Sequence, residues 1–343
     1  MTIDDVRRIA AFLPDIDAAT DEQMLRAGVE QARAAVAAEL GAHTPTLVLA
    51  AVWSDMMRRS VAAAARVVAG GRPPGWTWFV SGSVARGEAI PGSDVETLVA
   101  LDDTVGDAGK TEALALAADV HALLERCGVR PDANGVLASR GRFCRRRANW
   151  SASIQKWCAE PAADRGVVMT GLLADATAVL GGDDQLRQQT ISAAQQHQVA
   201  RRAMLQDATA VRATIPSRLR VFATHDDTVD LKIAAIDPVV KIARWAALSA
   251  GSSALSTLDR LTDAAGPVLD SDDASILRDC YTSLARIRWR SRAGGWMKGE
   301  PISDRVSLAE LAPAERATLR TVAREIAGIR RKLNFLGSTS SFR

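Results

Sequence analysis

The sequence predicts a predominantly helical α+β protein, in which a small β-sheet is followed by a C-terminal helical bundle. Two observations lead to this prediction. Alanine-rich segments with apolar residues at helical spacing occupy most of the 343 residues. Aromatic and β-branched residues that favour strands are concentrated in one short region around residue 80. We therefore expect one sheet-containing domain between helical segments.

Helical periodicity defines nine segments, and two of the predicted helix starts carry capping-box patterns. The segments are residues 21–40, 46–69, 109–127, 149–159, 164–180, 184–213, 229–250, 272–292 and 314–336. Their order predicts a helical segment at 1–70, a sheet domain at 71–160, a helical domain at 161–337 and a frayed tail at 338–343.

The sheet is predicted from three short runs. GGRPPG at 70–75 stops the preceding helix, because glycine and proline disfavour its continuation. Residues 76–81 and 95–101 then supply aromatic and β-branched side chains for two strands, and 135–138 is a candidate third strand.

Composition excludes several classes of protein. Hydrophobic residues make up 48% of the chain, and 43 Lys and Arg against 40 Asp and Glu give a net charge of only +3, too even for a dedicated nucleic-acid binder. The four cysteines show no metal-binding spacing, and neither a signal peptide nor a membrane-length apolar run is present. We expect a cytoplasmic protein with neither a nucleic-acid nor a membrane partner.

A pair of carboxylates stands at the start of the second predicted strand. Alternate side chains of a strand share a face, so Asp94 and Glu96 should project together while Val95 points into the core. Two acids so close repel each other unless a cation lies between them. Mg²⁺ or Mn²⁺ suits such oxygen ligands and assists phosphoryl transfer.

The turn after the first predicted strand completes a possible phosphate site. Gly82 lets backbone N–H groups approach a phosphate, Ser83 adds a hydroxyl donor, and Arg86 adds a cationic fork that Glu88 could orient. A Gly-Ser turn or an acid-x-acid strand alone is usually structural. Their combination, strand, Gly-Ser, ten-residue loop and acid-x-acid strand, favours a nucleotide-phosphate site.

These residues resemble the signature of polymerase-β-type nucleotidyltransferases. In the signal-transduction branch of that superfamily, the DUF294 family related to PII-protein uridylyltransferases, the loop reads GSxGRxE followed by [ST]DxD. Here it reads GSVARGE at 82–88 and SDVE at 93–96, so that Ser93 matches, Ala85 replaces a glycine and Glu96 replaces an aspartate. The resemblance implies a small mixed-sheet catalytic domain that binds a nucleoside triphosphate and a divalent metal.

The resemblance extends over residues 45–336. It implies that 161–337 is a substrate-binding helical domain. Lys232 of its Asp-Leu-Lys motif could contact the nucleotide, but a salt-bridging helix start explains Asp230 and Lys232 as well. It also implies a third metal-binding carboxylate, for which Asp132 is the nearby candidate. The sequence Pro-Asp-Ala-Asn-Gly at 131–135 equally suits a plain turn.

The function expected from this resemblance is transfer of a nucleoside monophosphate from a nucleoside triphosphate to an acceptor hydroxyl, with release of pyrophosphate. The acceptor is open, with a regulatory protein as one candidate and an aminoglycoside-type small molecule as another. Glu96 has a longer arm than aspartate and could displace the metal, so a nucleotide-binding regulatory module without turnover is the main alternative. A helical scaffold with a relic loop is a further one.

Two other patterns lie within residues 140–157. The arginine-rich run RGRFCRRR at 140–147 either binds an anion or is a solvated helix entrance. Phe143, Trp150 and Trp157 are seven residues apart, which predicts one buried helix face if the segment is continuous.

Overall fold

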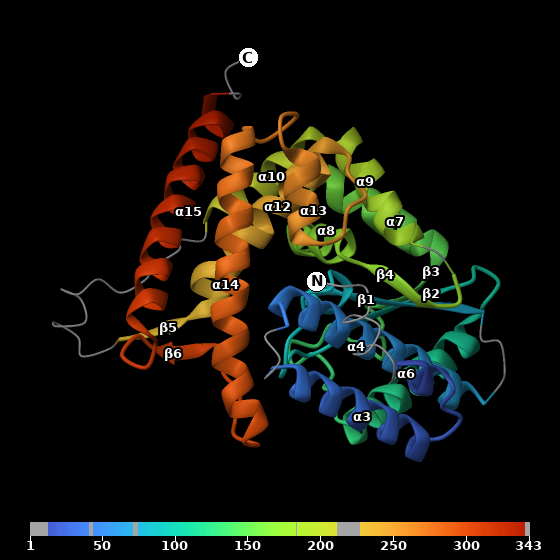
Figure 1. The fold of residues 1–343 in the computed structure, drawn as a ribbon. Helices are drawn as coiled ribbons and strands as arrows, with labels where there is room; N and C mark the ends of the chain where they lie inside the picture. The colour runs from blue at the N-terminus through green and yellow to red at the C-terminus, as the bar shows by residue number, and fades with distance from the viewer. Residues whose placement is uncertain (1–12, 41–43, 71–74, 183, 211–226, 340–343) are drawn as a thin grey trace. The chain divides into compact units, whose positions relative to one another are not determined.

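The computed structural model describes residues 13–40, 44–70, 75–182, 184–210 and 227–339. The protein is predominantly helical α+β, as predicted (Figure 1). It divides into two compact units: unit 1 contains residues 1–155 and 172–190, and unit 2 contains residues 156–171 and 191–343. Three helices contribute residues to both units: α7 (Arg147–Ala159), α8 (Gly166–Ala174) and α9 (Gln185–Gln196).

Unit 1 contains a small mixed sheet with strand order β3-β2-β1-β4. Its strands are β1 (Trp76–Ser81), β2 (Glu96–Leu101), β3 (Cys144–Arg146) and β4 (Thr177–Leu180). Strand β1 pairs antiparallel with β2 and β4, whereas β2 pairs parallel with β3. The β1–β2 register places Ser81 opposite Glu96, so the turn that follows β1 lies beside the first residue of β2.

Helix α4 (Thr46–Ala69) is the central helix of unit 1. It contacts α2 (Leu13–Asp17), α3 (Glu22–Leu40), α6 (Asp107–Arg126) and strand β4. Its bounds match the predicted segment 46–69, and it ends at Gly70, whose φ of 60° is the left-handed conformation that glycine adopts easily. The N-terminal helices therefore pack into the same unit as the sheet.

The third predicted strand is wrong. Residues 135–138 are not a strand, and β2 takes its other neighbour from Cys144–Arg146. The Asp132 carboxylate accepts a hydrogen bond from the Val136 amide at 2.8 Å and closes a turn there. Gly135 in that turn has a φ of 85°, outside the strand region. One backbone bond, from the Thr97 amide to the Val136 carbonyl at 3.0 Å, still attaches this turn to β2.

The predicted helix at 164–180 is correct only in its first part. Helix α8 ends at Ala174, and residues 177–180 form β4 on the free edge of β1. The run is almost continuously apolar, and periodicity cannot separate a buried strand from a buried helix in such a run. The predicted helix at 184–213 is also divided, into α9 and α10 (Gln198–Ala210), and 211–213 lie outside the described residues.

Unit 2 is a helical bundle with a two-stranded ribbon. The bundle consists of α10, α12 (Asp237–Ala250), α13 (Thr257–Ala264), α14 (Ser271–Met297) and α15 (Pro313–Thr339). The long helices α14 and α15 lie side by side, and α12 packs against α10 and α13 (Figure 1). The helix predicted at 229–250 begins only after β5 (Thr228–Asp230), which pairs with β6 (Arg305–Ser307), and after the π-helix η2 (Lys232–Ile236).

Asp304 connects the β6 end of this ribbon to α14. Its carboxylate accepts hydrogen bonds from Arg288 at 2.6 and 2.9 Å and from Arg292, and all three side chains are about nine-tenths buried. Burial alone would raise the pKa of Asp304, but the hydrogen bonds and charges of the two arginines outweigh it and lower that pKa overall. This buried ion cluster is a major polar constraint in unit 2.

Within the described ranges, no helix is both long enough and apolar enough to cross a membrane. The four cysteines are all buried and form no disulfide. Of the predicted tail at 338–343, residues 338 and 339 belong to α15 and the rest lie outside the described residues.

Candidate active site

The turn after β1 fits tightly against the first residue of β2. Gly82 has a φ of 64°, and a Cβ added there would stand 2.8 Å from Glu96 Oε2. A side chain at residue 82 would therefore suffer both backbone strain and collision with a carboxylate. The sequence predicted this glycine as space for a phosphate. The structure shows that the space also accommodates the Glu96 carboxylate.

Asp94 and Glu96 lie where β2 begins. Val95 between them is fully buried, as predicted, whereas both acids are partly exposed. Asp94 precedes the strand, and its Oδ2 accepts a hydrogen bond from the Ala133 amide at 3.4 Å. The acid pair is thus held between β2 and the segment that follows residue 130.

Asp132 lies beside this pair. Its amide donates to the Val95 carbonyl at 3.0 Å, and the Val95 amide donates to the Arg130 carbonyl at 2.9 Å, so residues 130–132 run parallel to the start of β2. The Asp132 side chain is 4% exposed and accepts from Val136 and from Asn134. The structure therefore combines the two readings of this residue: Asp132 closes its own turn, and that turn lies next to the acid pair.

Asp175, between α8 and β4, is a member of the site that the sequence analysis missed. It forms an ion pair with Arg86, which also pairs with Glu88 at 2.7 Å, and the three side chains are 2%, 9% and 8% exposed. The available signal was a single acid within the apolar run 166–180, which was predicted as helix. Glu88 does pair with Arg86, as one reading proposed. The direct contact of Arg86 with phosphate stays a prediction.

Burial and the neighbouring acids together raise the pKa of Glu96 to about 7. Burial is the largest cause, the negative charges of Asp132, Asp175 and Asp94 add to it, and the positive charge of Arg86 partly opposes them. Three other acids and one arginine thus act on the Glu96 carboxylate, so negative charge predominates around it. Such an imbalance favours uptake of either a proton or a cation.

The donor set suits a hard divalent cation, because Asp94, Glu96 and Asp132 offer carboxylate oxygens. In the part of the chain that the structure describes, however, no three acidic, histidine or cysteine side chains converge closely enough to enclose a metal. A Mg²⁺ or Mn²⁺ ion here would therefore take its remaining ligands from water and from substrate phosphate oxygens, which is usual for Mg²⁺.

The two predicted serines have different environments. The Ser93 hydroxyl accepts from the Ile90 amide at 3.0 Å, and the Ser93 amide donates to the Ile90 carbonyl, so Ser93 shapes the turn before the acids. Ser83 is half-exposed, and among the described residues its hydroxyl has no partner. The contact of the Ser83 hydroxyl with phosphate stays a prediction.

Lys232 belongs to unit 2, where it is exposed at the first position of η2. Asp230 accepts a hydrogen bond from the Ile233 amide at 2.9 Å and so caps the start of η2, but within the described residues it forms no salt bridge with Lys232. The binding of nucleotide by Lys232 stays a prediction.

Three arginines of the basic run have partners inside the protein. Arg146 pairs with Asp107 at 2.7 Å and Arg147 with Asp102 at 3.0 Å. Arg145 donates to a serine of α7 and lies 5.4 Å from the ring centre of a buried tryptophan. They hold the connection between β3 and α7 in place.

The three aromatic residues are buried, as predicted, but they do not share one helix. Trp150 and Trp157 are on α7, whereas Phe143 precedes β3. The prediction of a single helix face is wrong for Phe143, because residues 144–146 extend to pair with β2.

Comparison with known families identifies both parts of the chain. Residues 28–164 match the family model described as "Putative nucleotidyltransferase DUF294", a range that contains β1, the signature loop, β2 and Asp132. Residues 198–335 match the model described as "Putative nucleotidyltransferase substrate binding domain", which contains η2 and α12 to α14. No curated protein shows significant similarity to the chain. With the two matches spanning most of its length, the chain belongs to the DUF294 nucleotidyltransferase family.

Proposed function

We propose that this protein is a Mg²⁺- or Mn²⁺-dependent nucleotidyltransferase that moves a nucleoside monophosphate from a nucleoside triphosphate to an acceptor hydroxyl. The observation that carries the proposal is the grouping of Asp94, Glu96 and Asp132 beside the Gly82–Ser83 turn. The family of the chain supports the same class of reaction.

Asp94 and Glu96 would hold the cation, with Asp132 next to them. When bound, such an ion neutralises negative charge on the transferring phosphoryl group and on the departing pyrophosphate. Glu96 lies against Gly82, so a triphosphate lying on this turn would come close to the same carboxylate.

The protein's own groups would then position the reactants. The Ser83 hydroxyl donates to an oxygen of the triphosphate. Asp94 or Glu96 accepts the proton of the acceptor hydroxyl as its oxygen attacks the α-phosphorus. A new phosphorus–oxygen bond forms, the bond from the α-phosphorus to the bridging oxygen breaks, and pyrophosphate leaves with the electron pair of that bond.

A second candidate is a regulatory module that binds a nucleoside triphosphate without turnover. It is favoured by the lack of a three-residue metal group in the described residues and by glutamate in place of aspartate at position 96. Isothermal titration with ATP, GTP, CTP and UTP, together with a pyrophosphate-release assay, separates the candidates. Saturable binding without pyrophosphate supports the regulatory module.

The decisive test of transfer is α-labelled nucleoside triphosphate incubated with the purified protein and cell lysate, and separately with aminoglycosides. Asp94→Asn and Glu96→Gln are compared with Asp119→Asn, a control in which an exposed acid of α6 changes by the same chemistry. We expect label to reach an acceptor with the parent and the control but with neither site variant. Equal labelling by all four proteins would remove the two acids from the mechanism.

A further inference from the structure

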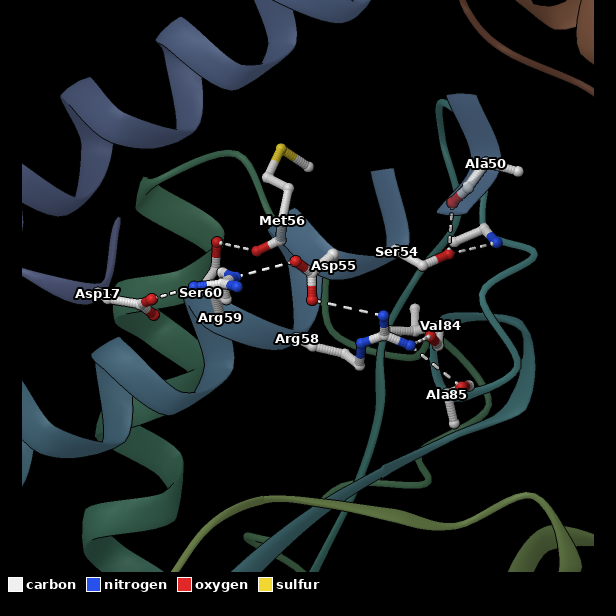
Figure 2. Close-up of polar contacts among 11 residues, drawn as sticks. Asp17, Ala50, Ser54, Asp55, Met56, Arg58, Arg59, Ser60, Val84 and Ala85 are labelled. Atoms are coloured by element: carbon white, nitrogen blue, oxygen red, sulfur yellow. Dashed lines mark hydrogen bonds and ion pairs between the residues drawn. The ribbon is translucent and has the colours of Figure 1, made fainter. Parts of the chain in front are cut away.

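Helix α4 contacts the signature loop, residues 82–90, through two polar side chains. Ser54 and Arg58 are four residues apart, which places them on the same face of the helix one turn from each other. Figure 2 shows both side chains directed at the loop, Ser54 at one part and Arg58 at another. Neither residue belongs to the signature itself.

Arg58 binds the end of the short helix α5 (Gly82–Ala85). Its Nη1 donates to the Val84 carbonyl at 3.4 Å and to the Ala85 carbonyl at 3.2 Å (Figure 2). The last carbonyls of α5 have no partner within this four-residue helix, although that of Val84 also accepts from the Gly87 amide at 3.4 Å. A fixed guanidinium is therefore well suited to hold them.

Ser54 holds the other part of the loop. Its hydroxyl accepts from the Ala89 amide at 2.9 Å and donates to the Ala50 carbonyl at 2.7 Å, and the side chain is fully buried. The loop is thus attached to α4 at residues 84–85 and again at residue 89. The ion-paired residues Arg86 and Glu88 lie between these attachments.

Arg58 is itself held by the charges of α4. Asp55 Oδ1 accepts from Arg58 at 3.4 Å, while Asp55 Oδ2 accepts from Arg59 at 2.9 Å. Arg59 also forms an ion pair with Asp17 of α2 (Figure 2). The two neighbouring arginines therefore share one acid, but only Arg58 has a bond to the loop among these contacts.

We propose that Arg58 is a positioning residue, which fixes the signature loop so that Ser83 and the Gly82 turn meet the triphosphate. The inference rests on the proposed nucleotidyltransferase function. A residue that holds a catalytic loop affects reaction rate and substrate affinity, because displacements of about an ångström at a reacting centre can reduce a rate by as much as a hundredfold. A residue that only stabilises the fold changes the amount of active protein and leaves the KM of that protein unchanged.

The test compares Arg58→Ala, Arg58→Lys and Ser54→Ala with Arg59→Ala in the full-length protein. Arg59→Ala is the matched control, because it removes an adjacent arginine of the same helix that pairs with the same Asp55. Two quantities are measured. The first is hydrogen exchange of peptides covering residues 82–90 without nucleotide, and the second is the KM for nucleoside triphosphate in pyrophosphate release.

We expect Arg58→Ala to increase exchange in the loop and to raise the KM about tenfold, because the loop that meets the triphosphate loses two hydrogen bonds from a charged donor. Arg58→Lys should fall between Ala and the parent, since an ammonium group can hold a carbonyl without the planar fork. Ser54→Ala should increase exchange near residue 89. Arg59→Ala should leave the KM within about twofold of the parent even where it lowers the melting temperature.

Unchanged loop exchange in Arg58→Ala, or an equal rise of the KM in Arg58→Ala and Arg59→Ala, overturns the proposal. The exchange measurement needs no activity, so it decides whether Arg58 orders the loop even if the parent protein releases no pyrophosphate. In that case calorimetric affinity for nucleotide replaces the KM. A parent protein that binds no nucleotide refutes both the proposed function and the positioning role.

Discussion

Replacing Glu96 by glutamine should stabilise the metal-free protein at high pH. Glutamine keeps the shape of glutamate and removes the charge that burial and the neighbouring acids Asp132, Asp175 and Asp94 disfavour. The pKa of Glu96 is raised from 4.5 to about 7. Between these two values the folded protein binds more protons than the unfolded chain, so its stability falls as the pH rises through this range.

The magnitude follows from that shift. One pKa unit corresponds to about 1.4 kcal/mol, so ionised Glu96 could lower the stability of the folded state by up to about 3 kcal/mol above pH 7. Part of the side chain reaches solvent, where water screens the neighbouring charges, and we therefore expect about 1–2 kcal/mol in practice. Below about pH 4.5 the difference between variant and parent should vanish.

The assay is urea unfolding of parent and Glu96→Gln in EDTA from pH 4.5 to 8.5, with Asp119→Asn as the control. Added Mg²⁺ should then stabilise the parent more than the variant, because bound cation supplies the missing positive charge. A variant less stable than the parent at pH 8, or a difference that does not change with pH, would refute the electrostatic account of this site.

Three further predictions concern individual side chains. Gly82→Ala should destabilise the protein by about 1–3 kcal/mol and abolish activity. Gly87→Ala is the control: Gly87 also has a positive φ, but a Cβ added there meets no heavy atom within 4 Å, so only the backbone cost should remain. Urea unfolding measures both costs. Asp304→Asn should lower the free energy of unfolding by about 3–5 kcal/mol, because it leaves two buried arginines without their carboxylate. Asp107→Asn, which breaks an exposed ion pair, should change the melting temperature little. Burial lowers the pKa of His121 to about 4, so between pH 6.5 and 4 the unfolded chain binds a proton at this residue and the folded protein does not. The free energy of unfolding therefore falls as the pH falls through this range, and His121→Gln should flatten the acid limb of the pH–stability curve.

Much of the fold could be predicted from local pattern. Helix α4 and strand β1 were predicted with the observed bounds, and β2 to within one residue, because periodicity and the glycine-proline boundary act on neighbouring residues. Strands β3 and β4 were not predicted. Their extended conformation depends on pairing with β2 and β1, which are distant in sequence, and in β4 the apolar composition is as compatible with a helix.

The candidate site also contains some residues that local sequence pattern could predict and others that it could not. Gly82, Asp94 and Glu96 are adjacent to strands whose order and spacing are visible in the sequence. Asp175 was missed because only the tertiary fold brings it to Arg86, 89 residues earlier in the chain. The contacts of Ser54 and Arg58 with the signature loop are also non-local, and the periodicity of α4 identified these residues only as part of a helix.

The passage of the chain between the two units has a consequence for how the protein can be made. Unit 1 receives β4 only after the chain has passed through residues 156–171 of unit 2. During synthesis, the apolar edge of β1 stays uncovered until residue 180 has been made and β4 can pair with it. A fragment that ends near residue 160 would leave that edge exposed to other chains. Gene fusions that exchange one unit as a single uninterrupted cassette should therefore aggregate.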